Sequence, residues 1–143
     1  MTGIFEYQHT VIDNEIDGHG HVNNLVYLKW MQTAAVSHSA DLGWPIARYR
    51  ECGIGWVARK HTIEYLKPAF LDQEILVQTW ISTLRKATSV RKYHIRRVED
   101  QTLLAMAETE WAFVDLKQHI PRRVPVEIRD AFPIVSPENE PQI

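Results

Sequence analysis

Residues 16–27, IDGHGHVNNLVY, mark the point where a polar loop gives way to an apolar helix. The first half of this stretch is rich in glycine, aspartate and asparagine, which favour turns. From about residue 24 to residue 42 apolar side chains recur at three- and four-residue steps, the period of a helix. No charged residue occurs between Lys29 and Asp41, which indicates a helix buried on most of its circumference.

The remainder of the chain has the composition of β-strands. Residues 4–12 are predicted as a first strand, and Gly43 and Pro45 mark the end of the helix. Four long segments rich in Val, Ile, Thr, Trp and Tyr follow, at residues 54–66, 74–84, 88–98 and 103–116. Their connections are short, which predicts antiparallel neighbours, because a parallel crossover needs about a dozen residues or more. The predicted fold class is α+β, with one central helix on an antiparallel sheet.

The domain organisation that we predict is simple. Residues 1–132 are expected to form a single domain and residues 133–143 a C-terminal tail. The region 121–143 carries five prolines and is predicted to be a short helix followed by loosely ordered chain. A single helical layer leaves sheet surface uncovered, so we expect a homo-oligomer.

The composition excludes several classes of protein. The chain has 143 residues and a net charge of −2, which does not favour a nucleic-acid partner. The single cysteine, Cys52, forbids an intrachain disulfide and favours a reducing compartment. The N-terminus lacks the pattern of a secretory signal, and no apolar run approaches a membrane span. We therefore expect a cytoplasmic protein with no membrane partner.

Two motifs resemble a known family. The pattern Asp17-x-x-Gly20-His21-Val22-Asn23-Asn24-x-x-Tyr27 before a buried helix, and the segment IEYLKPA at residues 63–69 followed by Asp72, are similar to the hotdog-fold acyl-CoA thioesterases. The closest type is the 4-hydroxybenzoyl-CoA thioesterase family. The resemblance implies a long central helix wrapped by a five-stranded antiparallel sheet, a homodimer or homotetramer, an acyl-CoA substrate, and no metal or other cofactor.

The family's turn usually carries two aspartates, of which the second acts. Here Glu15 stands at the first position and Asp17 at the second, so the resemblance assigns the acting carboxylate to Asp17. The His-Val-Asn-Asn version of the motif is more similar to that of fatty-acyl thioesterases than to that of the aromatic-CoA enzyme. The resemblance therefore does not define the acyl group.

Thioester hydrolysis needs a base or nucleophile and hydrogen-bond donors for the oxyanion. Asp17 can supply the first, as general base or as nucleophile, and backbone N–H groups at the helix start can supply the second. The residues predicted to be catalytic are Asp17, His21, Asn23 and Asn24. Those predicted to bind substrate are Gly20, Val22, Tyr27 and Glu64.

Several alternatives stay open from the sequence. Asn23 is also a good helix N-cap, Tyr27 is also a good core residue, and Asp17, His19 and His21 have the chemistry of metal ligands. Basic pairs at residues 85–86, 91–92 and 96–97 suit either the phosphates of coenzyme A or a solvated sheet face. The functional alternatives are a thioesterase or dehydratase acting on an acyl carrier protein, and a non-enzymatic acyl-CoA-binding protein.

Overall fold

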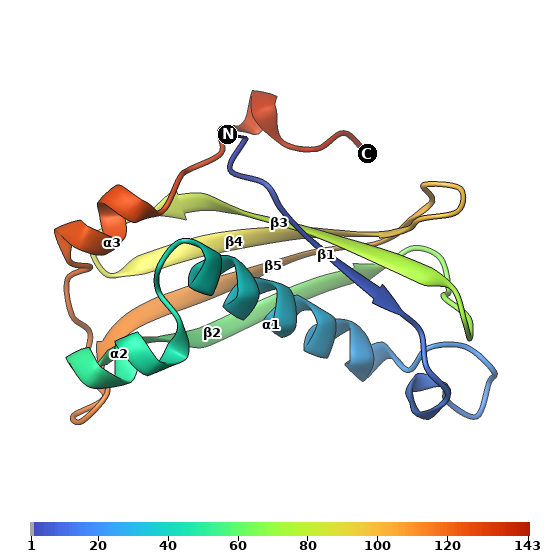
Figure 1. Cartoon of the computed structure of the whole chain (residues 1–143), viewed down its shortest axis with the longest axis horizontal. Helices are drawn as coiled ribbons and strands as arrows, with labels where there is room; N and C mark the ends of the chain where they lie inside the picture. The colour runs from blue at the N-terminus through green and yellow to red at the C-terminus, as the bar shows by residue number, and fades with distance from the viewer. Residues whose placement is uncertain (1) are drawn as a thin grey trace.

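The computed structural model describes residues 2–143, and its main feature is a curled sheet that holds one long helix on its concave side (Figure 1). The strands are β1 (Phe5–Thr10), β2 (Ile54–Tyr65), β3 (Glu74–Leu84), β4 (Thr88–Arg97) and β5 (Leu103–Asp115). The helices are α1 (Asn24–Asp41), α2 (Ile46–Cys52) and α3 (Val126–Ala131), with 3-10 turns at Asp13–Glu15 and Pro137–Asn139. The predicted strands and long helix are confirmed to within a few residues at each end.

The sheet has the strand order β1-β3-β4-β5-β2 and every pairing is antiparallel. The predicted hairpins between β3, β4 and β5 are confirmed. The expectation that β2 and β3 are neighbours is wrong, because β2 pairs with β5 and β1 pairs with β3.

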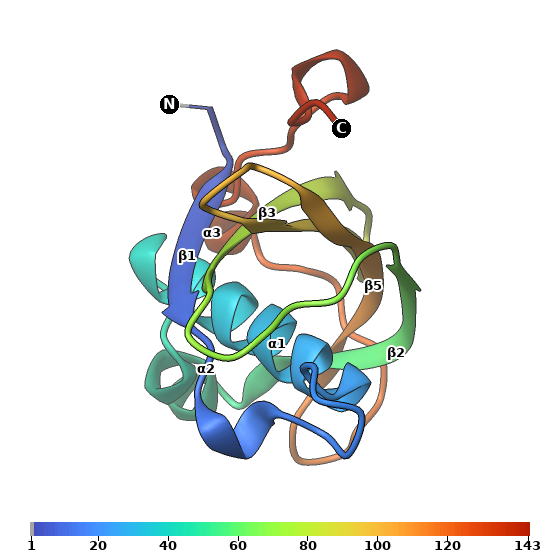
Figure 2. The same ribbon diagram turned by 90° about the vertical axis from the view of Figure 1, so that its right-hand side faces the viewer.

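The connection between β2 and β3, residues 66–73, passes across the N-terminal end of α1 (Figure 2). An extended chain covers at most about 3.5 Å per residue. So short a segment can link non-adjacent strands because the curled sheet brings its two sides toward each other around the helix. A short connection therefore predicts neighbouring strands in a flat sheet, but not in a sheet that is curled in this way.

The inward face of α1 packs into the main core. Its buried residues are Tyr27, Trp30, Met31, Ala34, Ala35 and His38. They meet alternate side chains of the strands, among them Ile75, Val77, Tyr93, Ile95 and Ala105. The expectation that most of the helix circumference is buried is wrong, since Leu25 is 75% exposed and Val36 45% exposed. One side of α1 is therefore uncovered in the single chain.

A second core cluster lies beyond the C-terminal end of α1. It is formed by Trp44, Tyr49, Ile54, Ile81, Phe113, Val124, Ile128 and Phe132. α2 and α3 both contribute to it, so α1 is the longest helix but not the whole helical layer. Among residues 2–143, no helix combines the length and apolar character that crossing a membrane requires.

The C-terminal tail is packed rather than loosely ordered, which corrects the prediction for residues after 132. Val135 is buried and donates its N–H to the carbonyl oxygen of Ile81 at 2.9 Å. On the outer face of the sheet, opposite α1, Glu140 accepts the indole N–H of Trp80 at 3.0 Å and lies 3.3 Å from Lys92 Nζ. These specific contacts order the tail although its sequence is rich in proline.

Candidate active site

The loop of residues 16–22 is a closed turn that ends at the start of α1. A bridge between Ile16 and Val22 closes it. Inside it, the N–H of Asp17 donates to the carbonyl of His21 at 2.9 Å, and the N–H of Gly20 donates to the carbonyl of Asp17 at 3.2 Å. Gly20 has a φ angle of +86°, a backbone conformation that residues other than glycine rarely adopt. The backbone of the loop is therefore held by its own hydrogen bonds.

The Asp17 carboxylate has one occupied and one freer oxygen. Oδ1 accepts the N–H of His19 at 2.8 Å, and Oδ2 lies 3.8 Å from Nδ1 of His21, which is too long for a hydrogen bond. The His19 N–H is the main reason that the pKa of Asp17 is lowered from its ordinary value. Asp17 is therefore ionised at neutral pH, with Oδ2 available to a ligand or to water.

The first turn of α1 provides hydrogen-bond donors beside this loop. Asn23 caps the helix, because its Oδ1 accepts the N–H of Leu25 at 2.9 Å. The N–H of Asn24, the first amide of α1, has no acceptor within residues 2–143. A free N–H at the positive end of an 18-residue helix is suited to stabilising an oxyanion.

Glu15, which precedes the loop, holds it against β1 and α1, a role that the sequence did not reveal. Glu15 is buried, and its carboxylate accepts two hydrogen bonds, from the N–H of Ile12 at 2.9 Å and from the indole N–H of Trp30 at 3.1 Å. The two carboxylate oxygens also lie 2.9 and 3.0 Å from Nε2 of His9. Burial raises the pKa of Glu15, but these hydrogen bonds outweigh it and the pKa is lowered. Its backbone carbonyl accepts the N–H of Asn23 at 2.9 Å, so Glu15 links β1 and α1 to the cap.

The segment that connects β2 and β3 anchors the loop from the other side. The N–H of Val22 donates to the carbonyl of Ala69 at 2.9 Å. At the end of β2, the hydroxyl of Tyr65 donates to the carbonyl of Asn24 at 2.8 Å. The second sequence motif, residues 63–69, therefore contacts the first motif directly. Both hold the start of α1 in place.

The other predicted substrate-binding residues are distributed differently. Val22 and Tyr27 are 1% and 2% exposed and belong to the main core. Burial also raises the pKa of Tyr27 to about 12. Glu64 is exposed, pairs with Met106 across the strands, and lines the cleft beneath the C-terminal tail on the outer face. Within one chain, Glu64 is therefore not brought to the Asp17 loop.

The two charged groupings seen in the sequence do not assemble into sites. Within the part of the chain that the structure describes, no three His, Cys, Asp or Glu side chains are placed to hold a metal ion. The basic pairs are divided by strand alternation. Arg91 is buried on the inner face, whereas Lys92 meets Glu140 on the outer face. Arg97 pairs with Asp100 at 3.1 Å. The pairs therefore do not form a single phosphate-binding patch.

A sheet curled around a long helix defines the hotdog fold, and solved structures share it. A 1,4-dihydroxy-2-naphthoyl-CoA thioesterase from Synechocystis, Slr0204, superposes with a TM-score of 0.84 over 90% of this chain and 95% of that chain, at 22% identity. A protein from Staphylococcus aureus, SAV2348, solved in complex with CoA, gives a TM-score of 0.84 over 90% of this chain and 80% of that one, at 15% identity.

The sequence comparisons identify the family. Residues 11–132 match the Thioesterase-like superfamily, and the chain belongs to it. The acyl-CoA thioester hydrolase YbgC of Escherichia coli is 37% identical over 79 residues, which is 55% of this chain and 58% of YbgC. The match therefore spans little more than half the length of that relative.

Proposed function

We propose that the protein is an acyl-CoA thioesterase, which hydrolyses an acyl-CoA thioester to the free acid and coenzyme A. The observation that carries the proposal is the ionised Asp17 carboxylate in the loop that leads directly into α1, where the N–H of Asn24 is free. Membership of the Thioesterase-like superfamily and the likeness to YbgC support this reaction. The CoA complex of SAV2348 supports coenzyme A as the carrier.

The proposed chemistry places the thioester carbonyl between these two groups. The N–H of Asn24, at the positive end of α1, stabilises the negative charge that develops on the carbonyl oxygen. Asp17 either takes a proton from the attacking water or attacks the carbonyl carbon itself, forming an anhydride that water then hydrolyses. In both routes the C–S bond breaks, the thiolate of coenzyme A leaves and takes up a proton, and the acid is released.

The other predicted residues have supporting parts in this proposal. His21, half-exposed and 3.8 Å from Asp17, borders the carboxylate. Gly20 permits the turn that presents it, and Asn23 fixes the helix start. Val22 and Tyr27 act by packing the base of the site. A role for Glu64 requires a second chain, because it faces away from Asp17 in its own chain.

We also propose a homodimer or homotetramer. β2 is a 12-residue edge strand, and among residues 2–143 no strand pairs with its free edge; unpaired edges of this length favour association. The exposed apolar residues Leu25 and Val36 of α1 add uncovered surface. A mass near the 16.7 kDa of one chain by light scattering would contradict an oligomer. Cytoplasmic location stays a prediction.

The test is thiol release from a panel of short, long, branched and aromatic acyl-CoAs. Asp17→Asn preserves size and removes the base, so kcat should fall by about 10²- to 10⁴-fold on the best substrate. Asp13→Asn is the matched control, since Asp13 lies in the preceding turn and is exposed, and it should keep its turnover. A folded Asp17→Asn protein within threefold of wild type would refute the mechanism. Binding without turnover by the wild type would identify a non-enzymatic acyl-CoA-binding protein.

One observation favours a second candidate, a dehydratase acting on an acyl carrier protein. Such a reaction uses a histidine with an acid, and the structure brings Nδ1 of His21 to 3.8 Å from Asp17 Oδ2. The separation exceeds a hydrogen bond, so the pair is not preformed. Loss of water from a 3-hydroxyacyl carrier protein, with no thiol release from acyl-CoA, would favour the dehydratase.

A further inference from the structure

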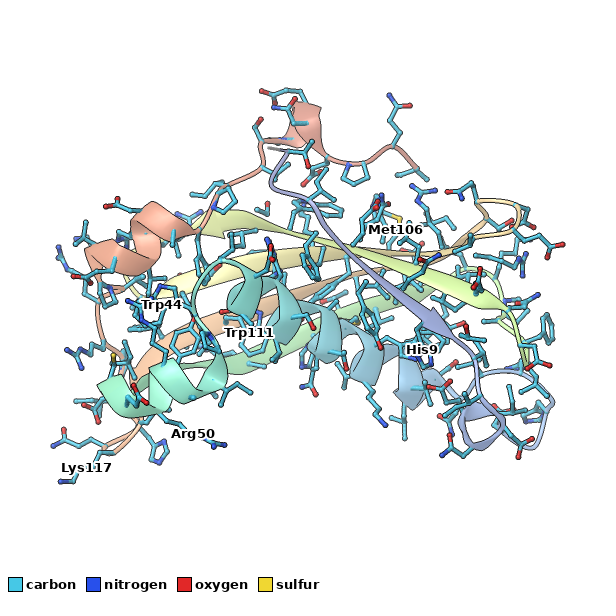
Figure 3. The ribbon with its side chains drawn as sticks, viewed as in Figure 1. His9, Trp44, Arg50, Met106, Trp111 and Lys117 are labelled. Atoms are coloured by element: carbon cyan, nitrogen blue, oxygen red, sulfur yellow. The ribbon has the colours of Figure 1, made fainter. Side chains whose placement is uncertain are left out.

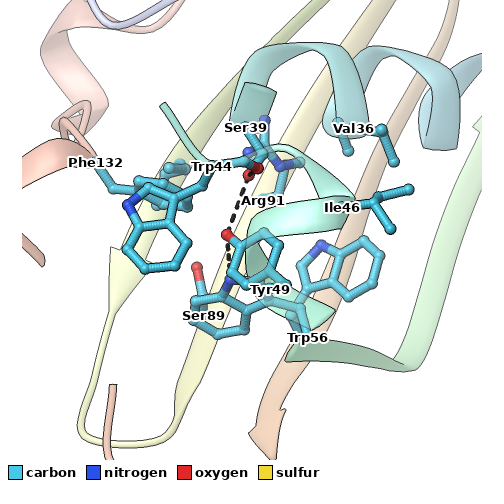
Figure 4. Close-up of a pocket in the computed structure, with 12 residues that line it drawn as sticks. Val36, Ser39, Trp44, Ile46, Tyr49, Trp56, Ser89, Arg91 and Phe132 are labelled. Atoms are coloured by element: carbon cyan, nitrogen blue, oxygen red, sulfur yellow. Dashed lines mark hydrogen bonds between the residues drawn. The ribbon is translucent and has the colours of Figure 1, made fainter. Parts of the chain in front are cut away.

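A cavity lies at the far end of α1 from Asp17. It occupies 220 Å³ between α1, α2 and the inner face of the sheet, and aromatic side chains dominate its wall (Figure 4). Its aromatic members are Trp44, Tyr49, Trp56, Trp111 and Phe132. In Figure 3, Trp44 and Trp111 lie toward one end of the molecule and His9, near the loop, toward the other. From Asn24 to Ser39 the helix rises about 22 Å, so within one chain this cavity is separate from the Asp17 site.

The wall of this apolar cavity includes a buried cation, Arg91. The residue is 5% exposed. Its Nη1 donates to Nδ1 of His38 at 2.9 Å and to Oγ1 of Thr79 at 3.1 Å. Within residues 2–143 no carboxylate pairs with it. A buried charge without a counter-charge is unfavourable, because burial removes its hydration.

The groups around Arg91 are neutral. His38 accepts from Arg91 through Nδ1, and burial, followed by the nearby Arg91 charge, lowers the pKa of His38 to about 3. Ser39 and the hydroxyl of Tyr49 hydrogen-bond to each other at 3.0 Å, and Trp56 donates its indole N–H to that hydroxyl at 3.2 Å. Arginine stays protonated in proteins. The cavity therefore has a net positive charge.

Part of the guanidinium is available to a ligand. Nε and Nη2 of Arg91 form no hydrogen bond with residues 2–143. Among residues 2–143, Nδ1 of His94 is the only side-chain nitrogen or oxygen that is both fully buried and without a hydrogen-bond partner. Because Nε and Nη2 of Arg91 also lack partners, they are not fully buried, and Arg91 lines the cavity. Together they offer two adjacent N–H directions, the geometry that binds a carboxylate in a bidentate manner.

We propose that this cavity binds a small apolar carboxylic acid, with its carboxylate on Arg91 and its ring or chain against the aromatic wall. A cavity of about 150 Å³ with an apolar lining is large enough for benzene. A volume of 220 Å³ therefore suits a substituted ring or a medium-length chain. The exposed side chain of Ile46, on α2, lies at its rim and gives access. The proposal goes beyond the proposed function and does not depend on it.

The experiment measures binding, not turnover. Wild-type protein is titrated with 3-phenylpropanoate and octanoate, and with 3-phenylpropanamide and octanamide, by calorimetry and by fluorescence of the cavity tryptophans. Each carboxylate should bind at least about tenfold more tightly than its amide, because the charge-assisted bonds are lost in the amide. Equal binding of acid and amide, or no binding of either acid, would overturn the proposal. This comparison needs no variant.

Two variants locate the charge. Arg91→Met keeps the length and apolar stem of the side chain, and it should abolish the preference for the acid over the amide. Lys92→Met removes the next charge along β4, on the outer face of the sheet, and should leave the preference unchanged. A folded Arg91→Met protein that still prefers the acid by tenfold would overturn the assignment. If Arg91→Met does not fold, Ile46→Trp, which narrows the rim, should weaken binding of both acids, and unchanged binding would overturn the location.

Discussion

Glu15 offers the sharpest test of how the loop is held. Its two oxygens serve three neighbours, the N–H of Ile12, the indole N–H of Trp30 and Nε2 of His9. Glu15→Gln retains one oxygen and replaces the other with a donor, so one of these N–H groups loses its acceptor. Trp30 is 2% exposed, so water cannot replace the lost partner. An unsatisfied buried donor costs about 1–3 kcal/mol, and we expect about 2 kcal/mol of destabilisation.

Thermal melting followed by circular dichroism measures this loss. For a chain of this length 1 kcal/mol corresponds to about 4 °C, so the Glu15→Gln variant should melt about 8 °C below wild type. Glu15→Ala removes both oxygens and should lose roughly twice as much. Glu99→Gln is the control, because Glu99 is exposed in the β4–β5 turn and surface changes are usually within about 0.5 kcal/mol. A Glu15→Gln protein melting within about 2 °C of wild type would refute the reasoning.

The same comparison has a defined pH dependence. The pKa of Glu15 is lowered in the folded protein from its ordinary value of 4.5. A lowered folded pKa means that the ionised carboxylate stabilises the fold at any pH above the unfolded value. That contribution is lost as the pH falls through the folded pKa. The stabilisation of wild type relative to Glu15→Gln should therefore still be present at pH 5 and be lost only in stronger acid.

Three further predictions concern the site and its surroundings. Asn23→Ala removes the N-cap of α1 and should lower the unfolding free energy, measured by chemical denaturation, by about 1 kcal/mol. Most of the turnover should remain. A hundredfold loss of kcat in a fully folded variant would instead assign Asn23 to the chemistry. Because the pKa of Asp17 is lowered, kcat/KM measured in a His21→Gln background should stay level from pH 7 down to pH 5, and a twofold decline there would count against Asp17 as the acting base. Activity should survive EDTA and Cys52→Ser, and a loss with EDTA that Zn²⁺ restores would point to metal chemistry.

The elements that the sequence predicts well are those that local patterns determine. α1 was expected at residues 24–42 and spans Asn24–Asp41, because its apolar spacing and the turn at Gly43 are local signals. The four long strands follow from β-branched and aromatic composition in the same way. The pairing of β2 with β5 was missed, since it joins residues far apart in sequence and depends on the curl of the sheet.

The candidate site shows the same division. The loop glycine and the helix cap could be predicted, because Gly20 and Asn23 are residues that a positive φ and an N-cap require. Glu15 has no local signal, since its partners His9 and Trp30 come from two other elements. Arg91 did carry a usable signal. It alternates with Tyr93 and Ile95, both buried, along β4, which places it on the inner face and apart from Lys92.

The pairing of β1 with β3 has a consequence for synthesis on the ribosome. The register joins Thr10 to Glu74 and Phe5 to Thr79, which are 64 and 74 residues apart. At about 5–20 residues per second, β1 waits roughly 3–15 s for β3, and the apolar face of α1 also waits for the strands that cover it. During this interval Trp30 and Met31 are exposed in the nascent chain. The nascent chain is therefore most accessible to chaperones while the ribosome is translating residues 43–73, and β1 can pair with its partner strand only after β3 emerges.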